Sequence, residues 1–368
     1  MDAPGSLQVA QRPANPAGIL VVGAGIIGLS IAWRLAQRGY SVSVYDQAHA
    51  ASEASWAGAG MLAPGGELQS DSPLLVPALE SRRLYPDFVD ELRAASGRYI
   101  DFRTCGGLDL CFSSEEVEQL NARAEGQLRL GIASKPLSRE RIAAFWPHAA
   151  RNNIAGGRFY PDDATVDPRD INAALLTVCR ALGVDIVEGS PVSDLVVTDA
   201  GIAMGQRTFA AAVIAGGAWS SQIRINQVPP LPAVEPVRGV LVGYRQPEPT
   251  CPTIVRHRHT YLLQRSNGLL IAGSSEERIG FDRAVPAELV NQIAARAATI
   301  LPHLADTTPT ESWMGFRPLS DSLHVQLWHS DRLYLAYGHF RNGILLAPWT
   351  AHTIASLLTE RIAAGCRT

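Results

Sequence analysis

The first regular pattern in the chain is a short apolar run, then apolar residues at helical spacing, then a second apolar run. Residues 19–22 (ILVV) have the composition of a strand buried on both faces. Apolar positions recur at helical spacing over 29–36, and Gly39 is expected to end that helix. Residues 41–46 (SVSVYD) then predict a second strand. Together they predict a β–α–β unit of about 30 residues.

Similar patterns recur far along the chain and predict further pieces of the same α/β layer. They comprise an amphipathic helix at 171–183, strands at 184–187, 192–197 and 209–214, and a terminal strand, turn and helix over 332–358. The intervening segments have a different texture. Strands are predicted at 237–243, 260–264 and 269–273, and Asn267-Gly268 marks a hairpin turn between the last two. We therefore expect a largely antiparallel, β-rich second unit inserted into a discontinuous first one.

Composition narrows the function classes. A chain of 368 residues is long enough for two domains. A net charge of −3 gives no electrostatic reason to expect nucleic acid as a partner. The chain lacks the run of about 18 apolar residues that a membrane span needs, and residues 1–15 do not resemble a signal peptide. Five scattered cysteines without a C-x-x-C pair predict a reduced, cytoplasmic protein with no metal site.

Three glycines stand between the first predicted strand and its helix, in the sequence VGAGIIG (22–28). Gly23 permits a tight turn, Gly25 lets the backbone approach a pyrophosphate, and Gly28 lets the helix pack closely on the strand. Asp46 follows the second strand, where an acid can hold ribose hydroxyls. This context predicts dinucleotide binding. A packing turn that binds nothing is the alternative, and the glycines alone leave NAD and FAD both open.

A second glycine-rich stretch, ASWAGAGMLA (54–63) before Pro64, contains small residues and no charge. Such a stretch lets a backbone lie flat against an extended cofactor, although composition alone favours a flexible glycine-alanine loop. The predicted strand at 209–214 leads into Gly216-Gly217, a second place where backbone can approach a ligand.

Four segments together resemble the D-amino-acid-oxidase (DAO) family of flavoenzymes. They are VGAGIIGLS (22–30), SWAGAGMLA (55–63) with Pro64, WMGFR (313–317) with Pro318, and GHFRNGILL (338–346). The resemblance spans almost the whole chain and implies the DAO fold, an α/β (α+β overall) architecture with a Rossmann-like FAD-binding domain and an antiparallel β-rich substrate domain. It divides the chain into a mobile tail (1–16), an FAD-binding domain (17–80, 156–224 and 329–368) and a substrate-binding domain (81–155 and 225–328).

The resemblance also implies which residues hold FAD. These are Gly23, Gly25, Ile26, Ile27, Gly28, Asp46, Gln47, Ala54, Ser55, Ala59, Gly60, Met61, Val192, His339, Phe340, Arg341, Asn342, Gly343, Ile344 and Leu345. Relatives that attach the flavin covalently use a cysteine near the last turn. Since no cysteine occurs between 252 and 365, we expect non-covalent FAD.

For the substrate, the resemblance places Arg317 on an amino-acid carboxylate, with Tyr261 and Arg341 as secondary contacts and no acid–base residue. The implied reaction is oxidation of glycine or another small amine by O2 to glyoxylate (from glycine), ammonia and hydrogen peroxide, linked to thiamine biosynthesis, by a cytoplasmic tetramer. The alternatives are a D-amino acid or sarcosine oxidase, a dehydrogenase with another electron acceptor, and a non-catalytic flavin-binding protein. Two features leave the substrate open: Glu276, where some relatives carry an apolar residue, and the cluster of His257, Arg258 and His259 beside Tyr261.

Overall fold

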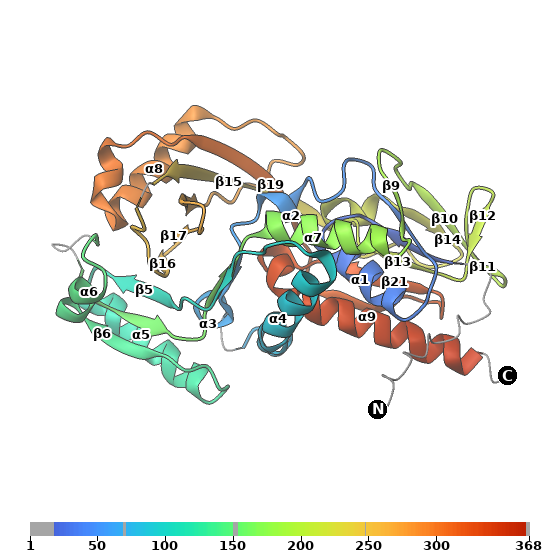
Figure 1. The fold of residues 1–368 in the computed structure, drawn as a ribbon, viewed down its shortest axis with the longest axis horizontal. Coiled ribbons are helices and arrows are strands. Elements are labelled where there is room, and N and C mark those ends of the chain that lie inside the picture. The colour runs from blue at the N-terminus through green and yellow to red at the C-terminus, as the bar shows by residue number, and fades with distance from the viewer. Residues whose placement is uncertain (1–17, 69–70, 150–153, 247, 366–368) are drawn as a thin grey trace, which may run out of the picture.

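The protein has two lobes, each built on one large β-sheet (Figure 1). The computed structural model describes residues 18–365 except 69–70, 150–153 and 247, so the tail predicted at 1–16 lies outside the described part. In Figure 1, helix α9 runs along the right-hand lobe, and helix α8 lies on the left-hand lobe. The bounds of these helices are Gly343–Gly365 for α9 and Ala287–Ile300 for α8.

The first lobe contains a six-stranded sheet with the predicted β–α–β unit at its centre. In spatial order its strands are β20 (His324–Leu327), β21 (Leu333–Tyr337), β13 (Ala211–Ile214), β1 (Ile19–Val22), β2 (Val42–Tyr45) and β9 (Asp185–Val187). All neighbours pair in parallel except β20 and β21. The chain thus crosses from β2 to β9 and from β13 to β21 through long insertions.

Both faces of this sheet are covered, which explains why strands β1 and β13 are wholly apolar. Ile19 and Val21 of β1 belong to a core shared with α1 (Ile26–Gln37), α7 (Pro168–Ala181) and α9. Leu20 and Val22 point to the opposite face, where a four-stranded sheet packs. That sheet has the order β12 (Arg207–Phe209), β11 (Gly201–Met204), β10 (Asp194–Thr198) and β14 (Arg224–Asn226). The strand predicted at 192–197 thus forms β10 of this covering layer.

The second lobe contains an eight-stranded sheet that is antiparallel apart from one pair. Its order is β19 (Glu311–Leu319), β15 (Glu235–Arg245), β18 (Leu269–Gly273), β17 (Thr260–Gln264), β16 (Ile254–His257), β5 (Gly107–Cys111), β7 (Gly156–Tyr160) and β6 (Lys135–Ser138), with β16 and β5 parallel. The predicted hairpin is confirmed as β17 and β18, and its Gly268 has φ +83°. One face of this sheet packs on α8, whereas residues such as Tyr261 and Trp313 lie on the other face.

Three elements near the predicted domain boundaries pack with the other unit from the one predicted for them. Helix α4 (Leu75–Ser96) extends past residue 80, but its buried Tyr85, Phe88 and Leu92 belong to the core of α1, α7 and α9. Strand β7 falls in the range predicted for the FAD-binding domain but pairs within the eight-stranded sheet. Strand β20 falls in the substrate-domain range but pairs with β21. Periodicity could not assign these elements, because long-range pairing decides which sheet a strand joins.

Candidate active site

A cavity of about 340 Å³ lies between the two lobes and receives residues from both. Strands β1, β2 and β21 contribute their carboxyl ends or the turns after them, and β15, β17 and β19 contribute side chains from the second sheet. Of the residues predicted to bind FAD or substrate, all except Gly28 line this cavity. The carboxyl ends of parallel strands are the usual ligand site of open α/β sheets.

The three glycines of the loop between β1 and α1 have different structural roles. Gly23 has φ +106°, and a Cβ there would lie 2.3 Å from the carbonyl oxygen of Ala215. A Cβ on Gly28 would lie 1.9 Å from the carbonyl oxygen of Gly23, so Gly28 serves the close packing of helix against loop. At Gly25 the nearest obstacle is the Ser55 hydroxyl, 3.0 Å away. The cavity therefore meets the first turn of α1 where Gly25 carries no side chain. A helix start, whose first N–H groups have no partner within the helix, favours an anionic ligand.

Asp46 follows β2, and its carboxylate joins this strand end to the glycine loop. Oδ2 accepts a hydrogen bond from the Ala24 N–H (2.7 Å), and Oδ1 accepts one from the Ala48 N–H (2.9 Å). Burial raises the pKa of Asp46, while both backbone donors act to lower it. Asp46 and Gln47 line the cavity beside Val192.

The small-residue stretch after β2 lies against the start of α1. Ser55, in the short helix α2 (Ala54–Ala57), accepts a hydrogen bond on Oγ from the Ile26 N–H at 2.9 Å. Gly60 has φ +94°, and a Cβ there would lie 1.8 Å from the Val166 carbonyl oxygen. On strand β19, Gly315 leaves room for Ala57, whose Cβ would lie 2.7 Å from an added one. The two glycine-rich motifs are therefore held in direct contact, which sequence spacing alone did not show.

The turn from β21 into α9 forms another wall of the cavity. His339 is buried and shares a hydrogen bond between its Nε2 and the Thr350 hydroxyl at 3.0 Å. Burial lowers the pKa of His339 to about 3, so its imidazole is neutral at physiological pH. All seven residues from 339 to 345 line the cavity at the beginning of α9.

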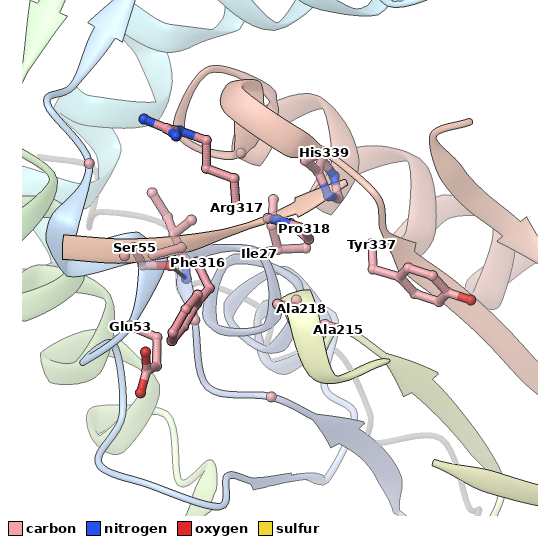
Figure 2. Close-up of a pocket in the computed structure, with 18 of the residues that line it drawn as sticks. Ile27, Glu53, Ser55, Ala215, Ala218, Phe316, Arg317, Pro318, Tyr337 and His339 are labelled. Atoms are coloured by element: carbon pink, nitrogen blue, oxygen red, sulfur yellow. Dashed lines mark hydrogen bonds between the residues drawn. The ribbon is translucent and has the colours of Figure 1, made fainter. Parts of the chain in front are cut away.

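Arg317 and Tyr261 meet at the second-lobe wall. Arg317 donates from Nη1 to the Ser275 carbonyl oxygen (3.0 Å) and from Nη2 to the Ser274 hydroxyl (2.8 Å). Its pKa is lowered mainly by burial, whereas Tyr261 nearby acts in the opposite direction. Figure 2 shows Arg317 and Phe316 on opposite sides of their strand, as alternation requires. Burial raises the pKa of Tyr261, so its hydroxyl stays protonated, and Gly273 faces the ring.

Arg341 lies between two acidic side chains. Its Nη2 lies 3.5 Å from Glu67 Oε2, and its Nη1 lies 3.7 Å from Glu276 Oε2. The two lining arginines thus differ: Arg317 donates to neutral oxygen atoms, and Arg341 is ion-paired to two carboxylates.

Sequence reasoning missed several lining residues. They include Glu53, Glu67, Trp219, Gly239, Phe316 and Tyr337. The backbone approach predicted at Gly216-Gly217 is consistent with the structure, since both glycines line the cavity. Trp219 stacks on Phe281 with ring centroids 4.8 Å apart, and Phe281 meets Phe316 at 5.2 Å. Among these missed lining residues, Glu67 alone had a local sequence signal, because it is an acid three residues after the Pro64 that closes the small-residue stretch.

These features fit a long, flat dinucleotide. Glycine backbone faces the cavity at Gly25 and Gly217, a helix start opens on it, and Asp46 lies at the adjoining strand end. The lining residues that the structure describes include no cysteine. Within the described residues, no group of three His, Cys, Asp or Glu side chains could hold a metal ion. None of the described helices is long and apolar enough to cross a membrane.

A Rossmann-type glycine loop that opens into a cavity closed by an antiparallel sheet defines a dinucleotide-binding enzyme. Residues 18–357 match the family of FAD dependent oxidoreductases (DAO), and the chain belongs to that family. FAD is therefore its cofactor, and the question of NAD or FAD left open by the glycines is resolved.

Similar proteins cover nearly the whole chain. The glycine oxidase of Geobacillus kaustophilus (strain HTA426) is 32% identical over 351 residues, which are 93% of each chain. The bifunctional protein ThiO/ThiG of Synechocystis sp. is 33% identical over 93% of this chain and 52% of its own length. The crystal structure of the glycine oxidase from Geobacillus kaustophilus has a TM-score of 0.88 at 31% identity, covering 94% of this chain and 95% of that one. These similarities confirm the predicted family and fold class.

Proposed function

We propose that the protein catalyses the FAD-dependent oxidative deamination of glycine and other small amines. Glycine, oxygen and water would give glyoxylate, ammonia and hydrogen peroxide. The observation that carries this proposal is Arg317, a half-buried guanidinium that lines the cavity and donates hydrogen bonds to two neutral oxygen atoms, those of Ser274 and Ser275. The similarity to glycine oxidases over 93% of the chain supports the same substrate class.

The cofactor would lie along the first lobe. Asp46 and Gln47 would hold the adenosine ribose, Val192 the adenine region, and the loop from Gly23 to Gly28 the pyrophosphate. The segments 54–61 and 339–345 would flank the flavin ring, and the start of α9 would direct backbone N–H groups toward it. When bound, FAD supplies the electron acceptor for oxidation of the substrate. The absence of a lining cysteine among the described residues supports non-covalent attachment.

The second lobe would orient the substrate. Arg317 would bind its carboxylate in a bidentate manner, a geometry that guanidinium favours. The protonated hydroxyl of Tyr261 would donate to the same carboxylate. Arg341 would act at longer range, because two carboxylates already neutralise it. Holding Cα in one orientation is then the main contribution of these side chains, and no acid–base residue is required if the amine binds deprotonated.

We also propose that the six-stranded unit binds FAD, that the eight-stranded unit binds substrate, and that the enzyme is a cytoplasmic tetramer whose product serves thiamine biosynthesis. The four described cysteines are free, in keeping with a reducing compartment. The match to half of the bifunctional protein ThiO/ThiG supports the metabolic link.

The test is anaerobic mixing of the yellow holoenzyme with glycine, sarcosine and D-alanine, followed by exposure to oxygen. Flavin bleaching by glycine and stoichiometric hydrogen peroxide on reoxidation are expected. Faster bleaching by sarcosine or D-alanine would favour the corresponding oxidase, and slow reoxidation would favour a dehydrogenase. Absence of bleaching by every amine would leave a flavin-binding protein without this activity. Acid precipitation of the same sample should release intact FAD, and colour in the pellet would contradict non-covalent binding.

A further inference from the structure

The substrate end of the cavity contains a charged group that the reaction itself does not require. Arg341 lies between Glu67 and Glu276, at 3.5 Å and 3.7 Å. Arg341 and Glu67 line the cavity together with Arg317 and Tyr261. Two guanidinium groups and the Glu67 carboxylate therefore line this end of the cavity. Glu276 lies outside the lining with its side chain 48% exposed, and its carboxylate is paired with the same arginine as that of Glu67.

Glu67 is held in place by a buried network beneath it. It ends the short helix α3 (Pro64–Glu67), whose Gly65 and Gly66 carbonyl oxygens accept hydrogen bonds from Arg123 Nη2 (3.1 and 3.3 Å). A Cβ at Gly66 would lie 2.0 Å from Cζ of the buried Arg256, so the helix rests directly on that guanidinium. Arg256 is itself fixed by ion pairs with Asp109 (2.5 Å) and Asp163 (2.8 Å). The backbone that carries Glu67 is thus held by contacts with two arginines, Arg123 and Arg256.

The backbone that carries Glu276, in the segment after β18, is held by contacts of its neighbours Ser275 and Glu277. Arg238, which is only 3% exposed, donates to both carboxylate oxygens of the adjacent Glu277 at 3.0 and 2.8 Å. In the same segment the Ser275 carbonyl oxygen accepts from Arg317. The segment that orients Arg317 therefore also fixes the backbone that carries Glu276.

We propose that Glu67 and Glu276 neutralise Arg341 and so make the pocket selective for amines with a single carboxylate. This inference rests on the proposed function. Arg317 is available for one carboxylate, whereas a second carboxylate on the substrate would meet an arginine already paired and two acidic side chains. Like charges brought together in a partly buried site repel, which gives specificity by rejection of the wrong substrate.

The test compares two N-substituted glycines that differ by one carboxylate, sarcosine (N-methyl) and iminodiacetate (N-carboxymethyl). In the natural holoenzyme, kcat/KM for sarcosine should exceed that for iminodiacetate at least about tenfold. Glu276→Gln should narrow this ratio by roughly tenfold, equivalent to about 1.4 kcal/mol, and Glu67→Gln should act in the same direction. The matched control is Glu235→Gln, which removes a carboxylate paired with Arg278 on the outside of the same lobe and should leave the ratio unchanged.

Binding of unreactive ligands separates this inference from the proposed function. Methoxyacetate and oxydiacetate have the same shapes but contain no amine, and their dissociation constants follow from changes in flavin absorbance. Glu276→Gln should tighten oxydiacetate relative to methoxyacetate by roughly tenfold. If the natural enzyme oxidised no amine, the proposed function would fail while this ratio still reported on the charges. If both ratios stayed within twofold of the natural protein in both glutamine variants, or if the natural enzyme preferred the dicarboxylates, the inference would be overturned.

Discussion

The guanidinium of Arg317 lies so close to Gly239 on the neighbouring strand that a Cβ at Gly239 would lie 2.2 Å from its terminal nitrogens. Gly239→Ala should therefore displace the guanidinium without altering its charge. Because a misplacement of about 1 Å can cost up to 100-fold, we expect kcat/KM for glycine to fall roughly 10- to 100-fold, with FAD content unchanged. Steady-state kinetics and the flavin-to-protein ratio check this.

The control for that variant is Gly243→Ala on the same strand, where the added Cβ would meet Glu311, Leu269 and Trp313 instead. Its kinetics should match the natural enzyme in whatever fraction folds. Equal kinetic losses in both variants would mean that strand distortion, and not Arg317, causes the effect.

Arg317→Ala should weaken transition-state binding of glycine by about 2–5 kcal/mol, because the substrate carboxylate loses its charged partner. Arg317→Lys should recover only part, since an ammonium group cannot form two parallel hydrogen bonds. Oxidation of an amine that lacks a carboxylate should be almost indifferent to both changes. Equal losses for glycine and that amine would direct attention to Arg341.

The glycines of the first motif should separate stability from cofactor binding. Gly28→Ala forces a Cβ against the Gly23 carbonyl oxygen and should lower the free energy of unfolding by roughly 1–3 kcal/mol. Gly25→Ala meets only the Ser55 hydroxyl and should cost less than about 1 kcal/mol in the apoprotein, while weakening FAD at least about tenfold. Urea unfolding of the apoprotein and FAD titration measure the two effects. Tight FAD binding by Gly25→Ala would show that the pyrophosphate lies elsewhere.

His339 should make the protein sensitive to acid. Its pKa is lowered by burial to about 3, so the unfolded chain, with an ordinary histidine pKa near 6.5, binds more protons than the folded one between these values. Stability is therefore present above pH 6.5 and is lost as the pH falls. From pH 7 to pH 5 the natural protein should lose about 2 kcal/mol more unfolding free energy than His339→Asn. Equal losses in urea titrations at the two pH values would contradict a buried neutral imidazole.

The sequence predicted local features well and relationships between distant residues poorly. The β–α–β unit and the hairpin around Gly268 were predictable because their signals lie within a few residues of one another. The contact of Ser55 with Ile26 depends on how distant segments pack. The room that Gly239 leaves for the Arg317 guanidinium and Gly273 for the Tyr261 ring depends on strand register. The ion pairs of Arg341 depend on three separate segments, so no local pattern could indicate that this arginine is neutralised.

The chain order of the cavity walls has a consequence for biosynthesis. Strand β1 is translated before the eight-stranded sheet, but β21 of the same six-stranded sheet and the wall formed by residues 339–345 are translated after all strands of the eight-stranded sheet. A nascent chain can build the eight-stranded sheet while the flavin site still lacks one side. Flavin loading is therefore a step that follows synthesis of residues 339–345, and a messenger RNA interrupted before the codons for α9 yields a polypeptide without flavin. Such long-range closure also predicts slow maturation.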